Sequence, residues 1–523
     1  MEILKPARYI NREWNAVHKE WAPSMLKVAL CFPDIYEIGM SHLGMKIIYG
    51  ILNEECDVVC ERVFAPWEDK EKEMRSKDEA LLSLESGREL KDFDIIGFSL
   101  QYEMNFVDAL NILDLGRVPL MASERGDNDP LVIAGGPCCF NPGPMSDFVD
   151  AFVIGEAEDT IIKIAALAKD LKGRRKEIIE EICKIDGVYA PQIEKDAINK
   201  NIVNDLDAAY FPTSPVVPYI QIVHDRIAIE IMRGCPHRCN FCQACRIFHP
   251  LRLRSVKRIL EIAERSVRNT GYEEISLLSL STSDYPHLEE LIEKLEERFK
   301  GLGVKISLPS VRAGSFQGDK AGSVLKRAGL TFAPEAGSDR LRKKLNKNMR
   351  NEDIIQKSLL ALRSGWRKVK LYFMIGLPGE TDEDLDAITE LASQIKSASL
   401  SISPFIPKPH SGFEREGMDG LEALKEKKQY LGSRLRNLGS RRHMKVDFHN
   451  PEMSRVEAIL SRGDRKIGAV IKKAWQKGAR LQAWTDFFDH NIWDSSFEEC
   501  GIDPKFYLNK KCEKEALSWG FIQ

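Results

Sequence analysis

The chain has 523 residues, of which 30% are charged, and a formal net charge of -3 at pH 7. This length predicts roughly three domains, and the near-neutral charge gives no general signature of nucleic-acid binding, although a local basic face leaves nucleic acid open as a partner. No stretch has the apolar length of a membrane helix or a secretory leader. We therefore expect a soluble, cytoplasmic protein without a membrane partner, whose twelve cysteines serve metal chemistry rather than disulfides.

Residues 1–210 alternate apolar strands with helical segments. Strands are expected over 27–32, 94–100, 131–134 and 152–156, and helices over 45–53, 105–115 and 158–168. Such alternation predicts an α/β domain with a doubly wound, Rossmann-like parallel sheet that is covered on both faces. Ligands bind sheets of this kind at the carboxyl ends of the strands.

Unusual residues gather at those predicted strand ends. Glycines there would let the backbone approach a large flat ligand closely, although each taken singly is also an ordinary turn glycine. The candidate ligand contacts are Asp34, Tyr36, Gly39, Gly44, Ser99, Gln101, Gly135 and Gly136. Five cysteines of the domain are interpreted as packing or surface thiols or, alternatively, as ligands of a second iron–sulfur cluster: Cys31, Cys56, Cys60, Cys138 and Cys139.

Three prolines, Pro212, Pro215 and Pro218, mark a linker over 205–219. Prolines at this density favour extended chain, so we predict domains over 1–210, 220–445 and 446–523. The second domain contains six predicted strands, over 227–232, 274–280, 304–309, 330–334, 369–375 and 400–405. The helices between them are expected over 256–268, 287–300, 339–346, 352–364 and 382–396. Six strand–helix units predict a partial barrel.

The loop after the first of these strands carries Cys235, Cys239 and Cys242. Three thiolates within eight residues can ligate three irons of a 4Fe-4S cluster and leave the fourth iron open for a small molecule. The alternative is a zinc site with Cys245 as the fourth ligand. Structural zinc sites usually draw ligand pairs from separate segments, so the iron–sulfur interpretation is favoured.

With Phe241 between the last two cysteines, this loop resembles the CxxxCxΦC signature of the radical SAM superfamily. The resemblance implies that Cys245 is not a ligand, because a fourth thiolate would block the iron that holds S-adenosylmethionine (SAM). It also implies a six-unit open barrel and a low-potential electron donor such as flavodoxin or ferredoxin as a partner.

The resemblance implies that Phe241 contacts SAM and places further SAM contacts at the ends of three more strands. Ser279 and Ser281 stand where the family often has Gly-Gly-Glu, and Glu335 with Ser338 matches a Glu-x-Gly-Ser pattern. Read without the family, Glu335 is a carboxylate favoured at a helix N-terminus. Leu377, in the tight turn Gly376–Gly379, would contact the adenine.

The first domain resembles the cobalamin-binding domain that precedes one subgroup of radical SAM proteins. That family has Asp-x-His-x-x-Gly in its ligand loop, whereas here His42 lies only two residues before Gly44 and Met40 replaces the Asp. We therefore expect cobalamin to bind without a histidine ligand, with His42 as a polar loop residue.

The tail interleaves Trp475, Trp484 and Trp493 with basic residues. Such a pattern can bind nucleic acid, but we favour a small, mainly helical extension that packs on the barrel. The whole pattern predicts a radical SAM enzyme that makes a 5'-deoxyadenosyl radical, coupled to cobalamin-dependent methyl transfer to an unactivated carbon of an unknown substrate. The alternatives are a methylthiotransferase-like enzyme for RNA or protein with a second cluster, and a non-catalytic metal-binding module.

Overall fold

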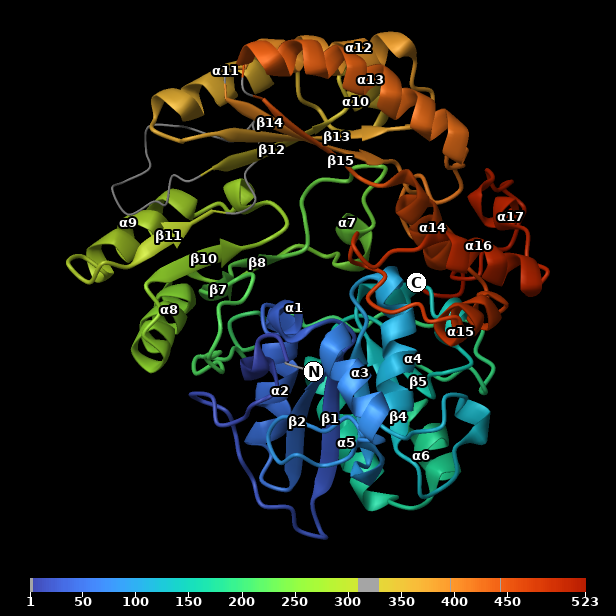
Figure 1. Cartoon of the computed structure of the whole chain (residues 1–523). Coiled ribbons are helices and arrows are strands. Elements are labelled where there is room, and N and C mark those ends of the chain that lie inside the picture. The colour runs from blue at the N-terminus through green and yellow to red at the C-terminus, as the bar shows by residue number, and fades with distance from the viewer. Residues whose placement is uncertain (1–2, 309–328, 396, 443) are drawn as a thin grey trace. The chain divides into compact units, whose positions relative to one another are not determined.

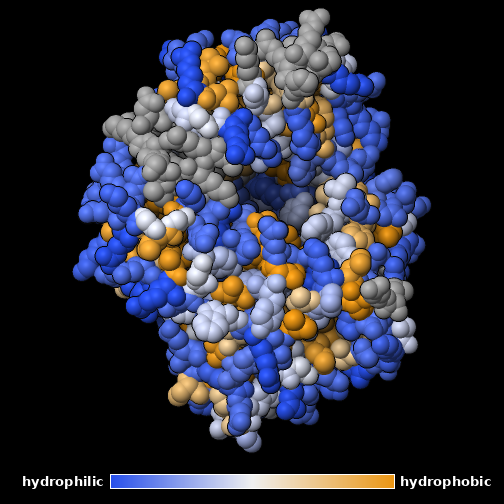
Figure 2. Space-filling model, turned by 60° about the vertical axis from the view of Figure 1, so that its left-hand side comes forward, coloured by the Kyte–Doolittle hydropathy of each residue, from blue (hydrophilic) through white to orange (hydrophobic). Residues whose placement is uncertain are grey.

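The computed structural model describes residues 3–308, 329–395, 397–442 and 444–523. The chain folds into two compact units (Figure 1). Unit 1 comprises Met1–Asp225, Leu460–Asp503 and Ala516–Gln523, and unit 2 comprises Arg226–Ile459 and Pro504–Glu515. Hydrophilic residues predominate on the face of the molecule shown in Figure 2. Among the described residues, no helix has the length and apolar character needed to cross a membrane.

Unit 1 is built on one sheet of six strands. These are β1 (Leu26–Phe32), β2 (Val58–Phe64), β3 (Ile95–Ser99), β4 (Leu131–Gly135), β5 (Ala151–Val153) and β6 (Val188–Tyr189). Their order is β2-β1-β3-β4-β5-β6, in which the first five are parallel and β6 is antiparallel to β5. The predicted doubly wound sheet is thus confirmed. Its strand order reverses between β1 and β3, where such folds form a ligand crevice.

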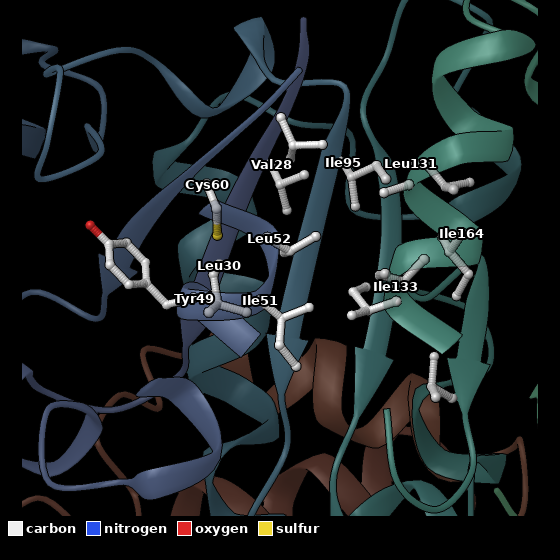
Figure 3. Close-up of a cluster of buried hydrophobic side chains, with 14 of the residues drawn as sticks. Val28, Leu30, Tyr49, Ile51, Leu52, Cys60, Ile95, Leu131, Ile133 and Ile164 are labelled. Atoms are coloured by element: carbon white, nitrogen blue, oxygen red, sulfur yellow. The ribbon is translucent and has the colours of Figure 1, made fainter. Parts of the chain in front are cut away.

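Helices cover both faces of this sheet, which explains its nearly continuous apolar strands. The helices are α1 (Tyr36–Gly39), α2 (Leu43–Glu54), α3 (Glu68–Lys77), α4 (Phe106–Leu115), α5 (Glu158–Asp170) and α6 (Arg175–Ile182). On one face Val28 and Leu30 of β1 pack with Leu52 of α2, and the same apolar cluster continues to Ile164 of α5 (Figure 3). The Cys60 side chain lies in this cluster too.

Strand β2 was not predicted from the sequence, because two charged residues in its middle interrupt the apolar run. Arg62 is 3% exposed, and its guanidinium binds Glu13 at 2.5 Å and Glu85 at 2.6 Å. Glu61 is also buried and accepts hydrogen bonds from Trp21 and Ser83. Buried charges of this kind are stable only when they are paired, so the partners make the strand possible.

In the residues of unit 2 that the structure describes, the strands form two parallel sheets and one short antiparallel pair. The first sheet has the order β11-β10-β7, from β7 (Ile227–Glu230), β10 (Glu274–Leu278) and β11 (Lys305–Ser307). The second has the order β12-β13-β14-β15, from β12 (Leu330–Glu335), β13 (Val369–Ile375), β14 (Ala398–Pro404) and β15 (Lys445–Phe448). Strands β8 (Met232–Arg233) and β9 (Arg252–Leu253) form the pair.

The six strands predicted for this region are present, and β9 and β15 are additional strands. In the described ranges the strands form separate sheets rather than a closed barrel. The predicted strand 304–309 reached Pro309 and the predicted helix 382–396 reached Lys396, and both of these end residues lie outside the described residues.

Helices follow most strands of unit 2 up to β14, and one of them has a preferred capping residue at each end. They are α7 (Ala244–Ile247), α8 (Val256–Thr270), α9 (Leu288–Arg298), α10 (Asp339–Lys344), α11 (Asn351–Arg363), α12 (Asp382–Ser393) and α13 (Leu421–Arg442). For α8, the Ser255 hydroxyl accepts a hydrogen bond from the Arg258 N–H at 3.2 Å, and Gly271 ends the helix with φ 72°. Both are preferred capping residues.

The tail is helical, as predicted, with α14 (Pro451–Arg462), α15 (Ile467–Gln476), α16 (His490–Glu499) and α17 (Pro504–Leu508). Its expected packing on the barrel is wrong for most of its length, because 460–503 and 516–523 belong to unit 1. There α15 packs against α4, and the Trp484 indole donates to Asp34 Oδ1 at 2.9 Å. Ile522 forms a bridge with Ile198. Apolar periodicity showed that these helices bury one face but not which surface covers it.

Candidate functional site

The cysteine loop begins at Gly234, directly after β8. That residue has φ 90°, and a Cβ there would lie 2.8 Å from the carbonyl oxygens of Phe248 and Pro250. Only glycine adopts this backbone conformation without strain and leaves room for the neighbouring chain. The loop therefore turns sharply after β8 and places Cys235 directly after the turn.

The middle of the loop is fixed by backbone hydrogen bonds. The Asn240 N–H donates to the Leu345 carbonyl at 2.9 Å, and the Asn240 carbonyl accepts from the Phe413 N–H at 2.8 Å. The Asn346 side chain donates to the Arg238 carbonyl at 2.7 Å. Two segments that follow α10 and β14 thus clamp the loop between its first and last cysteines.

The three predicted ligands differ in exposure: Cys239 is buried, whereas Cys235 and Cys242 are half-buried. The Cys245 thiol donates to the Cys242 carbonyl at 3.1 Å. Its hydrogen bond to the Cys242 sulfur lowers the pKa of Cys242 to about 6 and raises the pKa of Cys245 itself. In the described part of the chain, no three His, Cys, Asp or Glu side chains already form a metal-binding group. Three cysteine thiols in one loop are donors of the kind that iron–sulfur clusters use.

The predicted SAM contacts Phe241 and Leu377 lie in one apolar cluster. Leu377 is 2% exposed and packs with Phe405 and Phe413, and Phe241 packs against the edge of the same cluster. The aromatic residue of the cysteine loop and the turn after β13 thus lie in the same apolar cluster, and their contact with SAM stays a prediction.

Glu335, at the end of β12, is held in an unusual backbone conformation. Its φ is 68°, and the pairing of β12 with β13 shifts register between Phe332 and Glu335. A non-glycine residue in this region costs on the order of 1–3 kcal/mol, and such strain clusters at functional sites. The bend directs the carboxylate to Lys347, whose Nζ lies 2.8 Å from Glu335 Oε1.

Lys347 is a site residue that the sequence analysis missed. Its Nζ lies 5.7 Å from the centroid of the Phe241 ring, within cation–π range. Both side chains of the Glu335–Lys347 pair are at most 13% exposed. A lysine after a short helix carries no signal of its own, and only the fold brings it beside the cysteine loop.

The serines predicted to contact SAM have structural partners. Ser338 caps α10 by accepting from the Leu341 N–H at 3.1 Å, and its hydroxyl also binds Asp384. Ser279 shares a hydrogen bond with Thr282 at 3.1 Å. Ser281 donates to Asp284, which lies 2.8 Å from His237 Nε2. The loop after β10 is thereby tied to the cysteine loop through His237.

In unit 1, three of the predicted cobalamin contacts serve packing. Asp34 is buried, which raises its pKa, and it accepts hydrogen bonds from Trp484 and Asn105. The Tyr36 hydroxyl donates to Glu13. A Cβ at Gly39 would lie 2.3 Å from the Phe64 ring. These residues shape the loop after β1 rather than offering free polar groups.

The remaining predicted contacts are half-buried and lie at or after the carboxyl ends of β1, β3 and β4: Gly44, Ser99, Gln101, Gly135 and Gly136. Together with His42, which was expected only as a polar loop residue, they form a rim at this edge of the sheet. Gln101 donates to Ser99 Oγ at 2.9 Å. Gly136 has φ 112°, and a Cβ there would lie 2.5 Å from the Leu100 carbonyl. This rim fits a ligand that approaches backbone closely at the strand ends.

His42 is committed to α2. Its Nδ1 accepts a hydrogen bond from the Met45 N–H at 3.3 Å, which caps the helix. Burial lowers the pKa of His42 to about 4, so the ring is neutral at pH 7. Because Nδ1 is the acceptor, Nε2 carries the proton and has no lone pair for a metal.

Comparison with known proteins agrees with this organisation. The family "Radical SAM proteins, N-terminal" matches residues 44–191, and "Radical SAM superfamily" matches residues 229–392. The uncharacterized protein MJ0966 of Methanocaldococcus jannaschii is 31% identical over 454 residues, which are 85% of this chain and 90% of that protein. The ribosomal protein uS12 methylthiotransferase RimO of Vibrio vulnificus is 25% identical over 324 residues, 56% of this chain and 66% of that protein.

Among solved structures, the radical S-adenosylmethionine methyltransferase TsrM from Kitasatospora setae, with cobalamin and a 4Fe-4S cluster bound, has the same fold. The TM-score is 0.51 at 13% sequence identity, and the match covers 75% of this chain and 77% of TsrM. Both family models match this chain, and the match to MJ0966 covers most of both proteins. The chain therefore belongs to the radical SAM superfamily of enzymes.

Proposed function

We propose that this enzyme cleaves SAM reductively at a 4Fe-4S cluster held by Cys235, Cys239 and Cys242, and couples the radical to cobalamin-dependent methyl transfer to an unactivated carbon. The observation that carries the proposal is the convergence, within unit 2, of the cysteine loop with the buried Glu335–Lys347 pair through Phe241. A cysteine loop next to a carboxylate and an ammonium group suits a substrate that carries both a positive and a negative charge.

When bound and reduced by one electron from a donor such as flavodoxin or ferredoxin, the cluster supplies the electron that breaks a sulfur–carbon bond of SAM into methionine and a 5'-deoxyadenosyl radical. The chain's own groups bind and orient SAM. Glu335 offers a carboxylate to the ammonium or hydroxyl groups of SAM, and Lys347 offers an ammonium to its carboxylate. Phe241 and Leu377 provide the apolar wall on which an adenine can pack.

In unit 1 the half-buried rim from His42 to Gly136 would hold cobalamin, which supplies the methyl group that is transferred. The support is its place at the reversal of strand order and the close backbone approach at Gly136. Since His42 keeps its proton on Nε2, the chain would bind the cofactor without a histidine ligand.

The first test compares two cysteine variants after anaerobic reconstitution with iron and sulfide. Cys239→Ala removes a proposed ligand and should abolish formation of 5'-deoxyadenosine under strong reductant. Cys245→Ala is the matched control, because it removes a neighbouring thiol that we place outside the cluster, and it should retain the 4Fe-4S signal in electron paramagnetic resonance (EPR) spectra. A full yield of 5'-deoxyadenosine from Cys239→Ala would contradict the ligand assignment.

The second test addresses cobalamin. The reconstituted protein is incubated with hydroxocobalamin, desalted and examined by optical and EPR spectroscopy. Retained cobalamin whose Co(II) signal lacks nitrogen splitting is the expected result. If the cofactor washes away while the cluster forms, the enzyme is a radical SAM protein whose first domain has another role, and methyl transfer is the part that fails.

A methylthiotransferase-like activity, as in the RimO relatives, remains the alternative and requires a second cluster. Burial raises the pKa of the Cys31 and Cys139 thiols, which favours the protonated form rather than the thiolate that binds iron. An iron content of about four per chain is therefore expected, whereas about eight would favour the alternative.

A further inference from the structure

A groove lies on unit 2 beside the edge strand β15, away from the cysteine loop. It is a cavity of about 730 Å³ lined by α13, by β15 and by the first residues of α14. Its lining residues on α13 include Lys425, Gln429, Gly432 and Arg436, spaced by four, three and four positions. This spacing places them on one face of the helix, so the groove follows α13 for three turns, roughly 16 Å.

The floor of the groove is apolar. Leu435 is buried, and Met444, Val446 and Phe448 are half-buried on the same side of the chain that forms β15. The Phe448 ring lies against α13 at Gly432, where a Cβ would be 3.8 Å from it. The floor therefore presents the partly exposed sides of apolar residues that also pack on the core of unit 2.

The groove lies at the edge of the second sheet, where β15 is the last strand in the order. In the layer over this sheet, α12 packs against one side of α13, and α13 leads into β15. A further strand–helix unit would put its helix on the other side of α13, over β15. The helix that does follow, α14, contributes Pro451 and Glu452 to the lining of the groove.

The rim of the groove carries unbalanced positive charge. Lys425 forms ion pairs with Glu452 at 3.1 Å and with Glu422 at 3.5 Å. In the described ranges, Lys428 and Arg436 form no ion pair: Lys428 Nζ lies 5.9 Å from the centroid of the Phe448 ring, and Arg436 donates to the Gly432 carbonyl. Two cations beside an apolar floor select a partner that is apolar on one face and acidic at its flanks.

We infer that this groove is a docking site for an amphipathic, acidic α-helix of a partner protein. The helix would lie in the groove, with its apolar face on Val446 and Phe448 and its carboxylates on Lys428 and Arg436. The inference concerns a surface outside the cofactor sites and stands independently of the proposed reaction.

The experiment uses the full chain expressed in its native host with the photo-crosslinking residue benzoylphenylalanine at the exposed Gln429. The matched control carries it at Gln356, which is exposed on α11 of the same helix layer. The expected result is an adduct at position 429 only, with the crosslinked peptide identified by mass spectrometry as a segment rich in Asp and Glu whose apolar residues recur at helical spacing.

Charge reversal tests the recognition itself. The double variant Lys428→Glu/Arg436→Glu should lower the adduct yield by about tenfold. The control Arg363→Glu/Arg367→Glu changes two exposed arginines outside the groove by the same total charge and should leave the yield unchanged. Thermal unfolding of both variants checks that they are folded, and Phe448→Ser gives a second, uncharged test of the floor, with a similar loss expected.

Three outcomes would overturn the inference. Adducts with RNA would assign the basic rim to nucleic acid, and adducts with a second copy of this chain would assign the groove to self-association. A yield at position 429 no higher than at position 356, or one unaffected by Lys428→Glu/Arg436→Glu, would show that no acidic helix docks here.

Discussion

At the scale of single residues, the Glu335–Lys347 pair is the feature most directly open to test. We expect Glu335→Gln to weaken SAM binding by about tenfold or more, because a charge-assisted hydrogen bond contributes roughly 1.5–3 kcal/mol. The cluster should still form, since Glu335 is not among its ligands. Equilibrium dialysis with SAM measures the affinity, and iron content measures the cluster.

Glu352→Gln is the matched control for that prediction, since Glu352 is exposed on α11, and it should bind SAM as the unchanged chain does. Equal SAM affinities of the Glu335→Gln and Glu352→Gln variants would show that the strained glutamate shapes the backbone only.

We expect Lys46 to make the stability of the folded protein depend on pH. It lines a cavity of about 290 Å³ beside α2, and burial lowers its pKa to about 8 from the ordinary 10.5. Below pH 8 both the folded and the unfolded chain carry the proton, and the cost of burying the charge is fully present. Between pH 8 and 10.5 only the unfolded chain holds it, so this residue makes stability rise with pH there.

The Lys46→Met variant should therefore gain stability over the unchanged chain at pH 7, by about 1–3 kcal/mol, and lose most of that advantage near pH 10. Urea unfolding midpoints at the two pH values measure it, with Lys357→Met on α11 as the control. An advantage that is the same at both pH values would show that the ammonium is hydrated in the folded protein.

At the scale of elements, the close contact of β12 with α12 depends on one glycine. A Cβ at Gly337 would lie 2.4 Å from the Asp384 carbonyl oxygen and from the Ile388 backbone nitrogen. Because backbone cannot step aside as a side chain can, Gly337→Ala should destabilise unit 2 by about 1–3 kcal/mol and weaken SAM binding two residues away at Glu335.

Gly420→Ala is the control for this substitution, because no atom lies within 4 Å of its Cβ position. Thermal unfolding should separate the two variants by several degrees. If both melt alike, the helix has room to move and the contact does not position the end of β12.

The alternation of strands and helices was predictable because it is encoded locally, in the spacing of apolar residues and in the turn-forming residues between elements. Strand β2 was not, since Glu61 and Arg62 interrupt its apolar run, and their partners Glu13, Ser83 and Glu85 lie far from them in sequence. The same limit applies to the site. The cysteine spacing identified the loop and Phe241, but Lys347 became a candidate only when the fold placed it there.

Glycines and serines at strand ends were the least specific indicators of ligand contacts. Gly39 and Gly136 are required by neighbouring protein atoms, and Ser338 by the cap of α10. The fold needs each of these residues whether or not a ligand binds. Residue types at strand ends therefore predicted where the ligand-facing edge of the sheet lies, but not which ligand binds there.

At the scale of the whole molecule, unit 1 is completed by chain from the far end of the sequence. The Trp484 indole donates to the buried Asp34, and its ring packs edge-on against Trp67 at 5.7 Å between centroids. Trp484→Phe keeps the ring contact but removes the donor, so we expect a loss of about 1–3 kcal/mol, the cost of one unsatisfied buried group.

The midpoint of thermal unfolding measures this loss, and Trp14→Phe is the control, because Trp14 is 66% exposed. Unchanged midpoints in both variants would mean that Asp34 finds water or another donor when the indole is absent.

The way unit 1 closes on itself also sets an order of events during biosynthesis. Its first 225 residues leave the ribosome long before Leu460–Asp503 and Ala516–Gln523, which complete it. At typical elongation rates the wait for these last segments is roughly 15–60 s. During that time the apolar face of α4 that α15 later covers is exposed to chaperones and to other nascent chains. Translation speed and chaperone supply, rather than the stability of the finished protein, should therefore limit how much of it a cell can make.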